Sequence, residues 1–129
     1  MSGRSESHQI SQLRPVFGVQ GPALVRFVFI ESSIFSAYLI DYLTDDEYAK
    51  LQEYLCENPD AGDMVRGSGG VRKLRWSLPG RGKSGGVRIC YYAKNQVGQI
   101  FLLTIYAKNV KESISGQLLK QIKEAMEGL

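Results

Sequence analysis

The short segment Val71–Trp76, V-R-K-L-R-W, carries three cations among apolar residues and has the composition of a β-strand. Successive side chains of a strand point to opposite faces, so we expect Lys73 and Arg75 on one face and Arg72 on the other. Two cations at this spacing converge on one anionic group, and the planar fork of arginine donates paired hydrogen bonds to phosphate oxygens. The segment therefore predicts a sheet face that binds phosphate.

Other residues can join this face from neighbouring strands. Arg88 lies in the next predicted strand, Tyr106 ends the last one, and Lys108 follows it; side chains on adjacent antiparallel strands, about 5 Å apart, touch one another. Cleavage of RNA by its own 2′-hydroxyl needs that oxygen aligned and the charge on the phosphorane neutralised, which arginine does well. A lysine whose pKa is lowered by other cations and the Tyr106 phenol are alternatives for the proton transfer. The expected catalytic residues are Lys73, Arg75, Arg88, Tyr106 and Lys108.

The net charge of +3 hides a division of the chain into an acidic and a basic part. Ten lysines and arginines and no acid lie between Met64 and Lys111, whereas nine acids and only Lys50 lie between Glu31 and Asp63. A solvated surface ordinarily mixes both signs. The division favours a polyanionic partner, and RNA fits best.

Two glycine-rich segments have different expected roles. The link 78–86, L-P-G-R-G-K-S-G-G, is typical of a mobile basic loop, and we expect its Arg81 and Lys83, together with Arg72, to contact RNA. The G-S-G-G at 67–70 is followed by neither G-K-[ST] nor a helix, which indicates a turn rather than a nucleotide-binding loop.

Residue types that hold metals or act as paired acid and base are scarce. Cys56 and Cys90 are the only cysteines, without C-x-x-C or Cys/His spacing, and His8 is the only histidine. We therefore expect no metal and no cofactor, no catalytic pair of imidazoles, and reduced, buried thiols.

Length and hydropathy indicate one domain. Residues 1–24 mix glycine, proline, serine and glutamine without periodicity, which predicts a disordered extension before a single domain at 25–129. No run of eighteen apolar residues and no signal-peptide pattern occurs, so we expect a cytoplasmic protein that makes no membrane contact.

Helical periodicity follows the first predicted strand, Val25–Ile30. Ser32 or Ser33 can cap a helix, and Thr44 begins a second one because Glu47, three residues later, completes a capping box. The apolar faces expected for the two helices are Phe35, Tyr38, Leu39, Tyr42 and Leu43, then Tyr48, Leu51 and Leu55.

Beyond Gly62 the periodicity becomes that of extended chain, and three successive strands imply an antiparallel meander. Ser113 is expected to cap a last helix. The expected strands are Val71–Trp76, Val87–Tyr92 and Ile100–Tyr106, and the expected apolar stripe of the helix is Ile114, Leu118, Ile122 and Met126. The fold class is therefore α+β, in the order strand, two helices, three strands, helix.

The motifs L-R-W, G-G-V-R-I-C-Y-Y and L-L-T-I-Y-A-K-N, in this order, resemble the RelE superfamily of toxins from bacterial type II toxin–antitoxin systems, and its HigB branch in particular. The resemblance runs from about Phe27 to Met126 and includes the N-P-D-A-G-D turn and the basic G-R-G-K-S-G-G loop. It implies a RelE-like, microbial ribonuclease-type fold, an antiparallel sheet with two N-terminal helices and a C-terminal helix. It also implies an mRNA interferase: a metal-independent endoribonuclease that cleaves mRNA on the ribosome and so inhibits translation.

The resemblance implies roles for single residues. Lys73 and Arg75 look like the family's paired basic residues, Arg88 like its phosphate-binding arginine, and Lys108 like the basic position after the last strand. The chain departs from the archetype in having no tyrosine after Tyr106, so the group that transfers the proton stays open.

The implied partners are mRNA on the ribosome, ribosomal RNA and a cognate antitoxin, a HigA-like helix-turn-helix protein through which the chain would reach operator DNA indirectly. The alternative is a non-catalytic RNA-binding or ribosome-binding inhibitor of translation, which the scarcity of histidine favours. A DNA-binding module ranks last, because no predicted helix has a basic recognition face.

Overall fold

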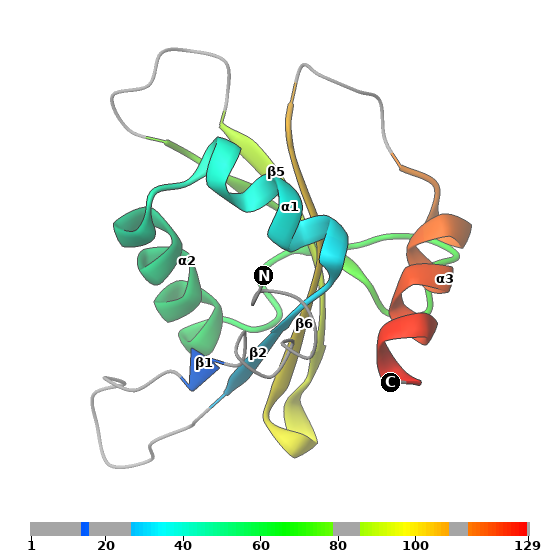
Figure 1. Cartoon of the computed structure of the whole chain (residues 1–129). Coiled ribbons are helices and arrows are strands. Elements are labelled where there is room, and N and C mark those ends of the chain that lie inside the picture. The colour runs from blue at the N-terminus through cyan, green and yellow to red at the C-terminus, as the bar shows by residue number, and fades with distance from the viewer. Residues whose placement is uncertain (1–13, 16–26, 79–85, 109–113, 129) are drawn as a thin grey trace.

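The computed structural model describes residues 14–15, 27–78, 86–108 and 114–128, which form three α-helices and a six-stranded sheet (Figure 1). The class is α+β, as the sequence predicts. The strands are β1 (Arg14–Pro15), β2 (Val28–Glu31), β3 (Asp63–Met64), β4 (Arg72–Trp76), β5 (Val87–Lys94) and β6 (Gln99–Ala107), and the helices are α1 (Ser33–Tyr42), α2 (Asp45–Glu57) and α3 (Gly116–Glu127). None of the helices in these ranges is long and apolar enough to cross a membrane.

The strand order is β1-β2-β6-β5-β4-β3. Strands β4, β5 and β6 form the predicted antiparallel meander. Strand β2 instead runs parallel to β6, an arrangement that requires a long crossover connection, and α1 and α2 lie within that connection. The sheet is thus mixed, which corrects the expectation of a wholly antiparallel one.

Helices α1 and α2 begin where the sequence predicts. The Ser32 hydroxyl accepts a hydrogen bond from the backbone N–H of Phe35 (2.9 Å), and Thr44 and Glu47 form the reciprocal capping box of α2. Of the tyrosines expected in the core, Tyr48 is buried but Tyr38 is 50% exposed. Tyr38 lies on the exposed side of α1, although its helical spacing from Phe35 and Leu39 predicts a buried side chain.

Each face of the sheet carries its own apolar cluster, and α1 and α2 lie on the side opposite α3 (Figure 1). The larger cluster joins α1 and α2 to the sheet and includes Phe29, Phe35, Leu51, Leu55, Ile89, Tyr91 and Leu102. The smaller cluster lies under α3, and we call it the α3-side cluster. It includes Val71, Cys90, Phe101, Leu103, Tyr106, Leu119 and Met126.

An irregularity in β6 changes which residues face α3. Cys90 pairs with Thr104, but the next residue of β5, Tyr91, pairs with Leu102, so Leu103 has no cross-strand partner on β5. Such an extra residue breaks the strict alternation of side chains along a strand. Leu103 and Tyr106, three positions apart, therefore pack in the same cluster. The Ser32 hydroxyl donates a hydrogen bond to the Leu103 carbonyl (2.7 Å), which ties the start of α1 to this point.

The last helix begins later than expected. Its N-cap is Ser115, whose hydroxyl accepts from the Leu118 N–H, and the predicted cap Ser113 lies outside the described residues. Leu119 is buried and Leu118 is 46% exposed, so the predicted stripe is displaced by one position at Leu118. The position of the N-cap does not decide which residue of α3 faces the sheet. Packing against the α3-side cluster decides it.

The side chain of Lys123 holds α3 in place. It is 9% exposed, its Nζ donates to the Gly69 carbonyl (3.2 Å), and it lies 4.6 Å from the centre of the Tyr92 ring. A buried ammonium is stable only with such partners. The G-S-G-G segment at 67–70, confirmed as a turn, thus anchors the last helix.

Tyr91 fixes the turn between α2 and the meander. Its hydroxyl donates to the Pro59 carbonyl (2.8 Å) and accepts from the Gly62 N–H (2.9 Å), and its side chain is fully buried. The Arg72 guanidinium donates to the Gly62 carbonyl (2.8 Å) from the adjoining strand. One phenol and one guanidinium therefore satisfy the polar groups of this turn.

Replacing Tyr91 by phenylalanine is expected to lower the free energy of unfolding by about 1–3 kcal/mol, because the buried Gly62 N–H loses its acceptor. Urea denaturation followed by circular dichroism measures the change. Tyr38→Phe is the matched control, since that exposed hydroxyl is expected to contribute almost nothing. Equal effects of the two substitutions would contradict the role given to Tyr91.

Candidate functional site

The structure brings three of the predicted catalytic residues together in one row across the meander. Arg75 of β4 lies directly opposite Arg88 of β5, and Arg88 lies directly opposite Tyr106 of β6. Residues paired in this way share one face of the sheet. Arg75 is exposed, Arg88 is half-buried and Tyr106 is 5% exposed, so the row runs from solvent into the α3-side cluster. We call Arg75, Arg88 and Tyr106 the basic row.

A second row lies beside the first on the same face. Lys73 pairs with Cys90, and Cys90 with Thr104, two residues along each strand from the basic row. Lys73 is half-buried and its charge acts on the Cys90 thiol. The predicted neighbourhood of Lys73, Arg75 and Arg88 on one face is thus found.

The carboxylate residue Asp63, which lies outside the basic segment in the sequence, lies on this face of the sheet. Asp63 of β3 lies opposite Lys73, at the end of the second row. Asp63 precedes the acid-free segment by one residue, and only the pairing of β3 with β4 brings it across. A carboxylate beside the cations adds a proton acceptor that sequence reasoning missed; the D-M-V-R-G-S-G-G stretch, with a turn after an extended pair, was the available signal.

Arg75 and Arg88 form a cross-strand pair of like charges. Like charges directly opposite one another destabilise a sheet. An anion held between the two guanidiniums removes that repulsion, and a phosphate matches their donor geometry. The arrangement is therefore suited to a phosphate diester that lies across β4 and β5.

Gly86 lets the two strands approach closely at this end. Its φ is +73°, and a Cβ there would lie 2.0 Å from the Trp76 carbonyl oxygen. Only glycine meets both conditions without strain. The close approach fixes β4 against β5 next to Arg75 and Arg88.

Tyr106 stays a phenol at neutral pH. Burial raises the pKa of Tyr106, the neighbouring Cys90 thiol raises it further, and the charge of Arg88 lowers it. The Tyr106 hydroxyl is hydrogen-bonded to Cys90. A neutral phenol can donate a hydrogen bond, but a raised pKa keeps it from acting as a base. Of the two alternatives for the base, the raised pKa therefore disfavours Tyr106.

Both thiols are held in the neutral form. Burial raises the pKa of Cys90 to about 11, against the lowering effects of Lys73 and Tyr106, and burial likewise raises the pKa of Cys56 to about 11. Neutral buried thiols are poor nucleophiles. Cys90 therefore fills space beneath the cations and offers no reactive sulfur.

The raised thiol pKa values predict a loss of stability in alkali. A group whose pKa rises on folding stabilises the folded state below its unfolded pKa, here 9.0, and loses that contribution as the pH approaches the folded value of about 11. We expect urea denaturation to give a smaller free energy of unfolding at about pH 10.5 than near neutrality, by up to about 2 kcal/mol for each thiol.

The control for this prediction is the double substitution Cys56→Ala and Cys90→Ala. The loss between the two pH values should be smaller in the variant than in the wild type, since the remaining titrating groups are the same in both. An unchanged loss would show that the thiols do not titrate with unfolding.

The remaining predicted residues lie at different distances from the basic row. Lys108 follows Tyr106 by two residues, is exposed, and is held by a hydrogen bond from its backbone N–H to the Gly86 carbonyl (3.4 Å). It is thus near the end of the row. Arg81 and Lys83 lie outside the described residues, and their contact with RNA stays a prediction.

Arg72 is separated from the other cations. It lies on the opposite face of β4, donates to the carbonyls of Asp60 (3.2 Å) and Gly62 (2.8 Å), and its Nε lies 3.8 Å from the Asp60 carboxylate. These contacts give Arg72 a part in holding the turn after α2. A contact with RNA through this side chain stays a prediction.

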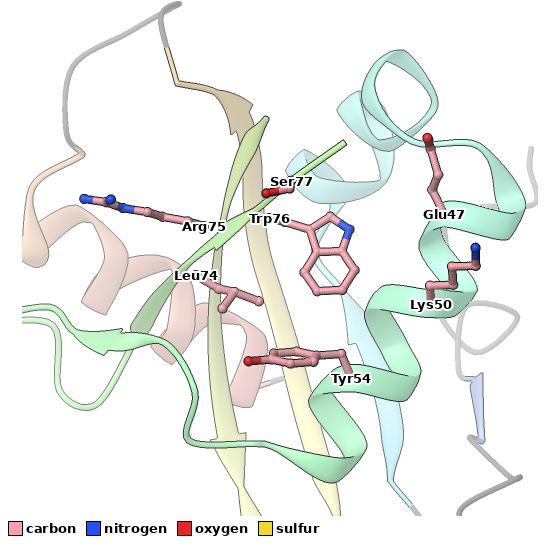
Figure 2. Close-up of a pocket in the computed structure, with 7 residues that line it drawn as sticks. All are labelled: Glu47, Lys50, Tyr54, Leu74, Arg75, Trp76 and Ser77. Carbon is pink, nitrogen blue, oxygen red and sulfur yellow. The ribbon is translucent and has the colours of Figure 1, made fainter. Parts of the chain in front are cut away.

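A pocket of about 540 Å³ opens between α2 and β4, on the other face of the sheet from the basic row. Figure 2 shows the Trp76 ring between β4 and α2, with Tyr54 below it and the Arg75 side chain directed away. The two rings are 5.3 Å apart between centres and inclined at 53°. The lining residues are Glu47, Lys50, Tyr54, Leu74, Arg75, Trp76 and Ser77. Trp76 is half-buried and also packs against the larger apolar cluster.

Within the described ranges, no group of three or more histidine, cysteine, aspartate or glutamate side chains is placed to hold a metal ion. The candidate chemistry described above uses the cations, the phenol and the Asp63 carboxylate of this chain.

No family model matches the sequence. Among solved structures, the chain is similar to an Escherichia coli toxin RelE, a double arginine-to-alanine mutant in the free state. The TM-score is 0.46 and the identity 14%, over 78% of this chain and 95% of the other. What this chain does has to be argued from its own side chains.

Proposed function

We propose that the chain is an endoribonuclease of the mRNA interferase type, the toxin of a toxin–antitoxin pair that cleaves mRNA on the ribosome. The observation that carries the proposal is the directly opposed pair Arg75 and Arg88, continued by Tyr106 on the third strand. The motif resemblance to the RelE superfamily and its HigB branch supports the same reading, and residues 25–129 form the active domain.

In this reaction the 2′-oxygen attacks the adjacent phosphorus and the 5′-oxygen of the next nucleotide leaves. The products are a 2′,3′-cyclic phosphate and a 5′-hydroxyl, and neither a metal nor a covalent enzyme intermediate takes part. Arg75 and Arg88 hold the non-bridging oxygens and neutralise the charge that builds on the phosphorane. Lys73 and Lys108 add positive charge on either side of that position.

Proton transfer is divided between two kinds of group. Tyr106, which lies opposite Arg88 in the basic row, serves as a donor to the phosphate or the leaving oxygen. Lys73 in its unprotonated form, or the Asp63 carboxylate opposite it, accepts the 2′-hydroxyl proton in this proposal. Arg72, Arg81 and Lys83 supply further contacts to RNA or ribosomal RNA.

The biological setting follows from the proposed activity. A cytoplasmic nuclease that stops translation needs restraint by a cognate antitoxin, of the HigA-like helix-turn-helix kind if the HigB resemblance holds. Operator DNA would then be reached only through that partner.

Mapping of mRNA ends after brief induction tests the proposal. New ends should appear in phase with codons on translated mRNA and should carry 5′-hydroxyls, which ligate to an adaptor only after phosphorylation. A non-catalytic inhibitor of translation, the second candidate, arrests growth without creating such ends. Ends that ligate without phosphorylation would contradict the 2′-hydroxyl mechanism.

A further inference from the structure

We infer that the pocket between α2 and β4 receives a base of the RNA strand whose phosphate lies on the basic row. The inference rests on the proposed function and adds a subsite to it. Trp76 and Tyr54 form the aromatic part of this pocket, and Leu74 the apolar part. We call it the base pocket.

The base pocket lies at an uncovered stretch of sheet edge. Strand β3 pairs with Arg72 and Lys73 only, so within the described residues no strand covers the outer edge of β4 from Leu74 to Trp76. A nucleic-acid strand can therefore pass from one face of β4 to the other around this edge. It needs to cross only one strand to reach the pocket from the basic row.

Arg75 is part of both the basic row and the base pocket. Its side chain stands on the basic row, yet the residue also lines the base pocket. The N–H of Val65 donates to the Val71 carbonyl (2.9 Å), and alternate residues of a strand turn their peptide groups to the same edge, so the main chain of Arg75 points outward as that of Val71 does. A nucleotide can thus meet the Arg75 guanidinium with its phosphate and the Arg75 main chain near its base.

The chemistry of the lining suits a base better than a phosphate. The rings offer π surfaces on which any base stacks. The Glu47 carboxylate is held by the Thr44 N–H (2.9 Å), and carboxylates accept hydrogen bonds from the exocyclic amino groups of bases. Asp45 and Asp46 begin the same helix and repel phosphates from this side. The backbone of the RNA should therefore stay on the basic face while an amino-bearing base enters.

The only tryptophan of the chain is Trp76, so its fluorescence reports on the pocket without labelling. Short RNA with 2′-O-methyl groups lacks the attacking hydroxyl and binds without being cut. Titration of the full chain with this RNA should quench Trp76 emission. An otherwise identical RNA, abasic at the nucleotide that enters the pocket, should bind about 5- to 100-fold more weakly and quench little.

The substitution Tyr54→Leu removes the stacking ring and keeps an apolar side chain. It should weaken binding of the intact RNA, measured by anisotropy of a labelled strand, and leave binding of the abasic RNA almost unchanged. Tyr38→Leu, an exposed tyrosine on α1, is the matched control and should change neither. Thermal melts of both variants show whether each is folded.

Two results would overturn the inference: equal quenching by the intact RNA and by every abasic RNA, or an equal effect of Tyr54→Leu on both. Quenching of Trp76 by the antitoxin but not by RNA would overturn it too and would make the pocket a protein contact. The readouts are separate from those of the proposed function. A base pocket with no 5′-hydroxyl ends refutes only the nuclease, and such ends with no base effect refute only the pocket.

Discussion

Replacing Arg88 by alanine is expected to slow mRNA cleavage by about 100- to 1000-fold, as removal of one preorganised donor to a developing negative charge commonly does. Arg88 is the central member of the basic row, with Arg75 on one side and Tyr106 on the other. Its loss would remove the proposed contacts to the phosphorane and also the positive charge that lowers the pKa of Tyr106. The rate is measured by primer extension on a ribosome-bound message in a purified translation system.

The control for charge alone is Lys120→Ala, an exposed cation on α3 outside both rows. It should leave the cleavage rate unchanged, whereas Arg88→Lys should restore only part of the activity, because an ammonium lacks the planar fork. A folded Arg88→Ala protein that cleaves at the wild-type rate would remove the basic row as the catalytic site.

Replacing Phe35 by alanine is expected to lower the free energy of unfolding by about 3–5 kcal/mol. Phe35 is fully buried in the first turn of α1, and its ring lies 5.9 Å from that of Tyr48 of α2. One side chain thus joins both helices to the sheet. A domain of this size has a total stability of about 5–15 kcal/mol, so the variant should be partly unfolded at physiological temperature. Chemical denaturation monitored by circular dichroism gives the value.

Tyr38→Ala tests whether position on α1 or burial causes the loss. Tyr38 lies less than one turn further along the same helix and is 50% exposed, so its removal should change stability by well under about 1 kcal/mol. Comparable losses at the two positions would show that helix propensity, and not the core, dominates the stability of α1.

Local signals predicted the elements of this fold well. Ser32, Thr44 and Glu47 form capping hydrogen bonds with residues three positions away, and these caps start the helices where expected. The alternation in V-R-K-L-R-W likewise placed Lys73 and Arg75 together, since strand geometry alone decides it. The class and the meander follow from such local rules.

Features that depend on pairing between distant segments were beyond the sequence. The parallel alignment of β2 with β6 and the position of Asp63 beside Lys73 arise from long-range contacts that no local pattern encodes. The exposure of Leu118 and burial of Lys123 depend on how α3 meets the turn at 67–70. The position of Trp76, at an edge of β4 that no described strand covers, depends on strand pairing and not on residue type.

Leu103 is an extra residue of β6 that pairs with no residue of β5. Deleting Leu103 would restore a regular register, because Leu102 and Thr104 already pair with the adjacent residues Tyr91 and Cys90. Tyr106 would still lie opposite Arg88, on the side of the cluster under α3. What the extra residue contributes is a fully buried side chain under α3 and the carbonyl that accepts a hydrogen bond from the Ser32 hydroxyl, so its deletion should lower the stability of the fold and leave the basic row in place.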